Sequence, residues 1–251
     1  MSKIALVTGA TSGIGRATAV ALAKHGYQLI VTGRRKERLE ELQQELQGVT
    51  TVLPLLFDVR IKEAVQFAIA SLPQGWQQID VLVNNAGNAH GLAPIQEGSL
   101  EDWDAMLDIN IKGLLYVSHS VIPFMQQQGR GHIINIGSIA GKEVYANGNV
   151  YCASKFAVDA LSKAMRIDLI QTGIKVSEVN PGLVETEFSE VRFKGDKERA
   201  AGVYQGYQAL QAEDIADLIA FIVSRPPHVN LAEVMILPAA QASATVVNKN
   251  L

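Results

Sequence analysis

Tyr151 and Lys155 are the clearest candidates for a catalytic acid–base pair in the sequence. They are four positions apart in a segment with helical periodicity, and this spacing stacks two side chains on one helix face about 6 Å apart. A cation held there favours the phenolate over the phenol, so we expect the pKa of Tyr151 to fall toward the range of an acid–base catalyst. Ser138 follows a strand-like run over 132–137, where its hydroxyl is well placed to hold a substrate oxygen near Tyr151.

A Tyr-x-x-x-Lys spacing is also common on half-exposed helices, but a glycine-rich turn near the start of the chain supports the catalytic interpretation. Residues 8–15 read TGATSGIG and lie between the first strand-like run and the first helix-like segment. Glycines at such a junction let the backbone approach a pyrophosphate, whose charge the helix N-terminus stabilises. Its position in the first strand–helix–strand unit predicts a dinucleotide site, although the spacing is Gly-x-x-x-Gly-x-Gly rather than Gly-x-Gly-x-x-Gly.

Two arginines, Arg34 and Arg35, follow the second strand-like run. A site specific for NAD usually places an acid here to bind the ribose 2′-hydroxyl, whereas a guanidinium suits the 2′-phosphate of NADP. The alternative is that both arginines belong to the exposed, charged helix that follows. Because the pair lies at the strand exit and no acid competes for the site, we predict NADP as the cofactor.

The order of apolar and amphipathic segments predicts the fold. Strand-like and helix-like segments alternate, and nearly unbroken apolar strands are typical of a parallel sheet covered on both faces. We therefore predict an α/β fold: a Rossmann-type doubly wound parallel sheet of about seven strands, with helices on both faces. No linker divides the chain, so residues 1–251 form a single dinucleotide-binding and catalytic domain. The expected strands are 4–8, 28–32, 51–57, 80–83, 132–137, 175–179 and 232–237, and the expected helices are 13–25, 35–46, 62–71, 99–125, 149–172 and 212–224.

Composition narrows the class of protein. Hydrophobic residues make up 48% of the chain and its formal charge is −3, which argues against a nucleic-acid-binding protein. The single cysteine, Cys152, excludes an intrachain disulfide, and the five histidines lack metal-ligand spacing, so we assign no metal. No apolar run approaches a membrane span, and the first strand begins too early for a signal peptide. We expect a cytoplasmic protein that does not bind membranes.

At this point the motifs resemble one family, the short-chain dehydrogenases/reductases. They occur in the family's order over nearly the whole chain, and three further stretches resemble the branch of NADP-dependent 3-hydroxy acid (serine-type) dehydrogenases. The family motifs are Thr8–Gly15, Asn84–Gly87, Asn110, Ser138, Tyr151-x-x-x-Lys155 and Pro181-Gly182, and the branch stretches are Thr32–Arg35, Pro181–Asp196 and Pro227–Asn230.

The resemblance implies a role for each matching residue. Tyr151 is the acid–base group, Ser138 binds the substrate oxygen, and Lys155 binds the nicotinamide ribose while lowering the tyrosine pKa. Asn110 holds a water that links Lys155 to solvent; the alternative is a buried, hydrogen-bonded amide. From physics alone, Asp58 and the turn at 84–87 are as readily turn residues as ligands. The implied cofactor-binding residues are Gly9, Thr11, Ser12, Gly13, Ile14, Gly15, Arg34, Arg35, Asp58, Val59, Asn84, Ala86, Gly87, Tyr151, Lys155, Pro181, Gly182, Val184 and Thr186.

The implied reaction is reversible, metal-free hydride transfer between NADP and an alcohol or carbonyl. The branch suggests 3-hydroxy acids or β-hydroxy amino acids: serine, allo-threonine, 3-hydroxyisobutyrate, or 3-hydroxypropionate with its semialdehyde. A substrate carboxylate needs a cation, and Arg192 and Lys194 are the candidates in the glycine-containing loop 181–210, which suits a substrate lid. The alternative is that both are surface charges. The alternatives are a broad NADPH-dependent carbonyl reductase and a non-catalytic NADPH-binding regulator.

Two further expectations concern assembly. The alanine-rich face of the helix that carries Tyr151 allows close helix approach, and the family implies a homo-oligomer, a tetramer or dimer, that pairs through this helix. Packing within one chain is the alternative. The tail over 238–251 is apolar and rich in small residues, so we expect it to pack on another surface, such as a neighbouring subunit.

Overall fold

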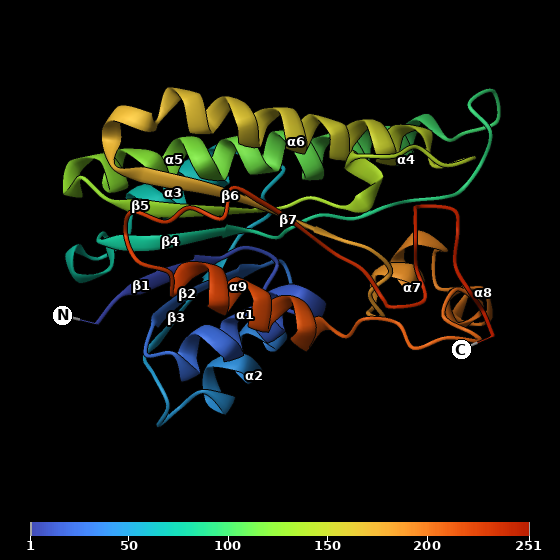
Figure 1. Ribbon diagram of the computed structural model, residues 1–251. Coiled ribbons are helices and arrows are strands. Elements are labelled where there is room, and N and C mark those ends of the chain that lie inside the picture. Colours follow the sequence, from blue (N-terminus) through green and yellow to red (C-terminus); the bar gives the residue numbers. More distant parts are fainter. Residues whose placement is uncertain (1, 251) are drawn as a thin grey trace.

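A seven-stranded parallel sheet is the centre of the computed structural model, which describes residues 2–250 (Figure 1). The strand order is β3-β2-β1-β4-β5-β6-β7, so the chain starts in the middle, runs to one edge, and returns to build the other half. The direction therefore changes between β1 and β4, where open α/β sheets bind ligands. The strands are β1 (Ile4–Val7), β2 (Gln28–Gly33), β3 (Val52–Leu56), β4 (Ile79–Asn84), β5 (Gly131–Ile136), β6 (Ile174–Pro181) and β7 (Glu233–Ile236).

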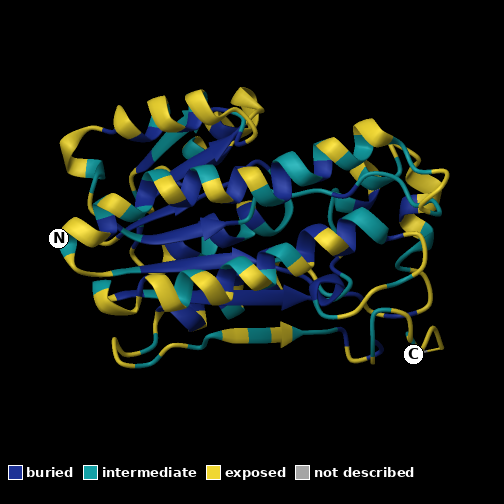
Figure 2. Cartoon of the chain, turned by 90° about the horizontal axis from the view of Figure 1, so that it is seen from above, coloured by how far each residue is buried: buried dark blue, intermediate teal, exposed yellow. Residues whose placement is uncertain are grey.

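Helices cover both faces of the sheet, as the apolar strands require. Alternate residues of a strand face opposite sides, and in β1 Ala5 and Val7 pack with α1, α2 and α9 while Ile4 and Leu6 pack with α3 and α5. Figure 2 shows the resulting pattern, with buried strands between helices whose outer sides are exposed. The helices are α1 (Gly13–Lys24), α2 (Lys36–Glu45), α3 (Lys62–Ala70), α4 (Leu100–Leu107), α5 (Leu114–Gln128), α6 (Asn149–Asp168), α7 (Phe188–Arg192), α8 (Lys197–Gly202) and α9 (Ala212–Val223).

The structure confirms the predicted fold class and strand positions but corrects the helix expected over 99–125. A π-helical segment, Asp108–Gly113, separates α4 from α5. At Gly113 the helix passes so close to the segment after β3 that an added Cβ would lie 2.8 Å from Val59 Cγ2. The helix does begin as predicted, since the Ser99 hydroxyl accepts a hydrogen bond from the Asp102 backbone N–H at 3.2 Å.

The segment over 181–210, expected to be irregular, contains the short helices α7 and α8. The tail packs against this segment of its own chain: the Gln241 side chain is buried and accepts a hydrogen bond from the Leu183 backbone N–H at 2.9 Å. Ala240 is buried beside Tyr207 and Ala209. No helix within residues 2–250 combines the length and apolarity needed to cross a membrane.

Candidate active site

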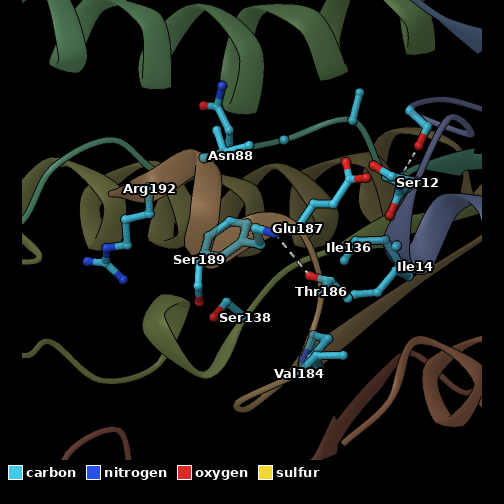
Figure 3. A pocket seen from close by; sticks show the side chains of 18 of the residues that line it. Ser12, Ile14, Asn88, Ile136, Ser138, Val184, Thr186, Glu187, Ser189 and Arg192 are labelled. Carbon is cyan, nitrogen blue, oxygen red and sulfur yellow. Dashed lines mark hydrogen bonds between the residues drawn. The ribbon is translucent and has the colours of Figure 1, made fainter. Parts of the chain in front are cut away.

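A cavity of about 500 Å³ opens at the carboxyl ends of the strands and collects most of the predicted site residues (Figure 3). Figure 3 shows Ser12 and Ile14 at one end and Ser138 and Arg192 at the other. The predicted residues that line it are Gly9, Thr11, Ser12, Gly13, Ile14, Arg34, Arg35, Asp58, Val59, Ala86, Gly87, Ser138, Tyr151, Lys155, Pro181, Gly182, Val184, Thr186 and Arg192. Four predicted residues lie outside this lining: Gly15, Asn84, Asn110 and Lys194.

Ser138, Tyr151 and Lys155 meet where β5 ends and α6 begins. Tyr151 is in the first turn of α6 and only 8% exposed. The Lys155 ammonium lies one turn further, 6.0 Å from the centroid of the Tyr151 ring, and donates a hydrogen bond to the Ile136 carbonyl at 2.9 Å. Ser138 follows β5 with extended backbone, which directs its hydroxyl into the same cavity. The helix spacing therefore brings these groups together as predicted.

The prediction that the tyrosine pKa falls is wrong for this structure. Burial raises the pKa of Tyr151, and the neighbouring Tyr145 adds to this effect, while the Ser138 hydroxyl and the Arg192 guanidinium lower it. Desolvation of the phenolate exceeds the attraction of these groups. Burial also lowers the pKa of the Lys155 ammonium, to about 8, against the attraction of Glu178.

Asn110 occupies the π-helical segment and joins two parts of the site. Its carbonyl accepts from the Asn88 backbone N–H at 2.9 Å, and its amide donates to the Asn88 carbonyl at 2.9 Å and to the Ser154 hydroxyl at 3.0 Å. These bonds connect the segment after β4 to α6, one residue before Lys155. Asn110 is thus a buried amide with partners, and the water-holding role remains a prediction.

The glycine-rich turn forms the opposite end of the cavity. Gly9 and Gly13 have φ of 66° and 51°, the left-handed region that glycine adopts freely, so the turn can present its backbone to the cavity. The Asn85 side chain fastens the turn by donating to the Thr8 carbonyl at 2.9 Å. Gly15 does not line the cavity. It is needed for packing within the turn, because an added Cβ would lie 2.9 Å from the Gly9 carbonyl carbon.

Asn84, predicted to bind the cofactor, is the last residue of β4 and points into the core. Its side-chain amide donates to the Ser118 hydroxyl and to the side-chain oxygen of Asn135, both at 2.9 Å. The neighbouring Asn85 lines the cavity instead. The sequence Asn84-Asn85 gives no signal that tells these two roles apart, because they depend on the residue at which the strand ends.

Arg34 and Arg35 lie at the rim beyond the turn, where they meet acids that the local sequence did not reveal. Arg35 donates to the hydroxyls of Thr11 at 3.0 Å and Ser12 at 2.8 Å, and pairs with Glu187 at 2.9 Å. Arg34 lies 3.7 Å from Asp58. The expectation that no acid competes for the arginines is therefore wrong, since the chain returns Glu187 to this place after β6.

Of the two candidate cations for a substrate anion, only Arg192 lines the main cavity. The Arg192 guanidinium lies in the cavity, 5.4 Å from the Tyr145 ring centroid and 5.5 Å from that of Tyr151. Lys194 pairs with Asp102 at 2.9 Å, with its side chain 62% exposed. A second hollow of about 190 Å³ borders the cavity and shares Tyr151 and Arg192 with it.

Several residues that line the cavity near Tyr151 were not predicted from the sequence. Tyr145 and Phe188 enclose Tyr151, and the ring centroids of Phe188 and Tyr151 are 5.7 Å apart. Gln241 and Ala244 of the tail also line the cavity. Aromatic residues in loops carry no periodic signal, so only their position in the fold identifies them.

A parallel sheet with a glycine-rich turn at its switch point, and Ser, Tyr and Lys around one cavity, defines a dinucleotide-binding enzyme site. The family model described as short chain dehydrogenase matches residues 3–197. The chain belongs to the short-chain dehydrogenase family.

Individual relatives indicate the branch of the family that this chain resembles. The chain is 48% identical over 242 residues to the NADP-dependent 3-hydroxy acid dehydrogenase YdfG of Salmonella typhi, covering 96% of this chain and 97% of that protein. It is 45% identical to sulfoacetaldehyde reductase 2 of Chromohalobacter salexigens, covering 100% of both. The solved closed form of a serine dehydrogenase complexed with NADP⁺ superposes with a TM-score of 0.92 at 45% identity, covering 97% of this chain and 98% of that one. The resemblance to the 3-hydroxy acid and serine dehydrogenase branch is confirmed.

Proposed function

We propose that the protein is an NADP-dependent oxidoreductase that interconverts 3-hydroxy acids or β-hydroxy amino acids with the corresponding carbonyl compounds. One observation carries the proposal: Tyr151, Ser138 and Lys155 share a cavity with Arg192, whose guanidinium carbon lies 5.5 Å from the centroid of the Tyr151 ring. The similarity to relatives named for NADP-dependent 3-hydroxy acid and serine dehydrogenases supports it.

The residues present fit a dinucleotide. The turn with Gly9 and Gly13 at positive φ opens its backbone toward the cavity at the start of α1, where anions are favourable. Arg34 and Arg35 stand at the end where a 2′-phosphate would reach, and a dianion can replace Asp58 and Glu187 as their partner. When bound, the nicotinamide supplies or accepts the hydride.

Side chains of the protein transfer the proton of the substrate hydroxyl. We propose that Tyr151 accepts the proton of the substrate hydroxyl during oxidation and donates it back during reduction, while Ser138 orients the same oxygen. Burial raises the pKa of Tyr151, so the phenol stays protonated, which is the form that donates in carbonyl reduction. Lys155, one turn along α6, is placed to stabilise negative charge that develops on the phenol oxygen.

Arg192 distinguishes anionic from neutral substrates in this proposal. Arg192 is half-buried, with its guanidinium near the rings of both Tyr145 and Tyr151, and its Nε donates to the Gly91 carbonyl at 3.3 Å, which helps to orient it. The remaining N–H groups can bind a carboxylate in a bidentate manner. A sulfonate suits the same fork, and the relative named sulfoacetaldehyde reductase 2 makes a hydroxyalkyl sulfonate the second candidate substrate.

We also propose that the protein is a cytoplasmic homo-oligomer that pairs through α6. Along one side of this helix Ala153, Phe156, Ala160, Ala164 and Ile167 are exposed, and Ile167 is 73% exposed. A continuous apolar stripe of this kind is typical of a covered surface. Light scattering tests the assembly: Phe156→Glu is expected to give a smaller species than the wild-type protein, and an unchanged mass would contradict pairing through α6. Cell fractionation tests the location.

The experiment for the function is a substrate panel. Purified protein is mixed with NADP⁺ or NAD⁺ and with serine, allo-threonine, 3-hydroxypropionate, 3-hydroxyisobutyrate, 2-hydroxyethanesulfonate or a neutral secondary alcohol, and formation of reduced nicotinamide is followed by absorbance. We expect turnover with NADP⁺ and with the anionic alcohols. Fastest turnover of the neutral alcohol would support a broad carbonyl reductase instead. Failure on every substrate in both directions would favour a non-catalytic NADPH-binding regulator.

A further inference from the structure

A buried cluster of charges lies directly behind the catalytic groups and is not explained by the proposed reaction. Lys142 binds the carboxylates of Asp159, Glu178 at 3.2 Å and Glu233 at 2.8 Å. The Glu178 side chain is fully buried, and that of Lys142 is 16% exposed. Lys142 comes from the turn after β5, and its three partners come from α6, β6 and β7, so one ammonium connects four elements of the fold.

The three carboxylates alone resemble a cation site, since each offers an oxygen within 4.8 Å of the other two. The Lys142 ammonium, however, hydrogen-bonds or pairs with all three and provides the positive charge at their centre. Burial raises the pKa of Glu178, and Lys142 acts against this by favouring the ionised carboxylate. The cluster is therefore an internal ion pair network of the protein.

The turn that carries Lys142 also carries Ser138, and the structure fixes this turn at both ends. At its start, the Ser138 backbone N–H donates to the Asn180 side chain at 3.0 Å. In its middle, Gly141 packs so closely on α6 that an added Cβ would lie 2.7 Å from the Lys155 carbonyl oxygen. At its end, Lys142 reaches the three carboxylates. The 3₁₀ turn Ile139–Gly141 between these anchors is too short to absorb a displacement of either end.

We propose that Lys142 is a positioning residue: by binding Asp159, Glu178 and Glu233 it holds the turn that places the Ser138 hydroxyl opposite Tyr151. The inference rests on the proposed function, because it assigns Lys142 to the reaction that Ser138 and Tyr151 perform. The proposed effect on the reaction acts through Ser138. Glu178 and Asn180 are two residues apart on β6 and face the same side, so β6 supports both ends of the turn.

A double-mutant cycle tests this proposal. Lys142→Met, Ser138→Ala and the double variant are compared with wild type in turnover of the best substrate from the panel. Lys142→Met is expected to lower kcat by about 10-fold to 100-fold, because small displacements of a group that binds the reacting atom have effects of this size. NADPH affinity, measured by nucleotide fluorescence, is expected to stay within about 2-fold. In the Ser138→Ala background the same substitution is expected to change kcat by less than about 2-fold.

Two further variants exclude a general effect on folding. Lys142→Arg keeps the cation and is expected to recover most of the activity. Lys163→Met is the matched control, since Lys163 binds the same Asp159 at 2.8 Å from the exposed side of α6 but does not touch the turn. It is expected to retain wild-type kcat. If Lys142→Met does not fold, Glu233→Gln replaces it in the cycle, because Glu233 is 39% exposed and its loss leaves no buried charge unpaired.

Equal losses from Lys142→Met with and without Ser138 would overturn the proposal and leave Lys142 a purely structural residue. Losses from Lys163→Met as large as those from Lys142→Met would also overturn it. A wild-type protein without turnover on any panel substrate contradicts the proposed function instead, so the two failures are distinguishable.

Discussion

The selectivity for anionic substrates is predicted to depend on Arg192. Replacing Arg192 by Gln removes the cation from the cavity but keeps a hydrogen-bonding side chain of similar reach. Hydrogen bonds to charged groups contribute about 1.5–3 kcal/mol, which corresponds to about 10-fold to 150-fold in kcat/KM at about 1.4 kcal/mol per tenfold. We expect the loss for 3-hydroxypropionate to exceed the loss for 3-hydroxypropionamide, its neutral isostere, by this factor.

The ratio of the two substrates isolates anion binding from a second effect of the substitution. The Arg192 guanidinium lowers the pKa of the buried Tyr151, so its removal raises that pKa further and affects both substrates alike. The contact with the Tyr145 ring is also lost for both. These common losses cancel in the ratio of kcat/KM values, which is measured from initial rates with saturating NADP⁺.

Lys194→Gln is the matched control, because it removes a cation of the same segment that pairs with Asp102 outside the main cavity. It is expected to leave the ratio of the two substrates unchanged. A uniform loss on both substrates in the Arg192→Gln variant would refute the carboxylate-binding role. A change in ratio from Lys194→Gln as large as that from Arg192→Gln would move that role to Lys194.

Three further predictions address the cofactor, the buried lysine and the π-helical segment. Replacing Arg34 and Arg35 together by Ala is expected to weaken NADPH binding by more than about 10-fold relative to NADH in fluorescence titrations, and equal losses would remove the 2′-phosphate assignment. Burial lowers the pKa of Lys155 from 10.5 to about 8, so between these pH values the unfolded chain binds more protons than the folded one. The free energy of unfolding of the wild-type protein therefore gains up to roughly 3 kcal/mol from this group as the pH rises from about 8 to about 10.5. Denaturant unfolding should show that Lys155→Met lacks this gain; a constant stability difference across the window contradicts the shift. Asn110→Ala leaves partners on Asn88 and Ser154 unpaired and is expected to lower the free energy of unfolding by about 2–3 kcal/mol, and a loss below about 0.5 kcal/mol would show that these bonds contribute little.

The elements of the fold were predictable because the sequence repeats one signal. Apolar runs such as 132–137 are buried on both sides and bounded by polar turns, so their positions agree with the strands within a few residues. The break at Asp108–Gly113 was not predictable, because apolar residues continue through it with a nearly helical spacing. The segment coincides with a long-range contact, the close approach of Gly113 to Val59, which local periodicity does not contain.

In the candidate site, too, some features follow from local sequence and others depend on long-range contacts. Tyr151 and Lys155 are related by helix geometry, and the structure places them as that geometry requires. The pKa of Tyr151 was not predictable, because it depends on burial among Tyr145, Phe188 and Arg192, and the last two come from a distant segment of the chain. The same holds for Glu187, which meets Arg35 from 152 positions away.

The central claim, that Tyr151 is the acid–base group of an NADP-dependent oxidoreductase, is tested most directly by Tyr151→Phe. The measurement is NADP⁺ reduction by the variant with the best anionic substrate, together with a titration of NADPH. We predict a loss of turnover of about 10²-fold to 10⁴-fold with NADPH affinity kept within about 2-fold, because only the phenol oxygen is removed. Turnover close to that of the wild-type protein would contradict the assignment.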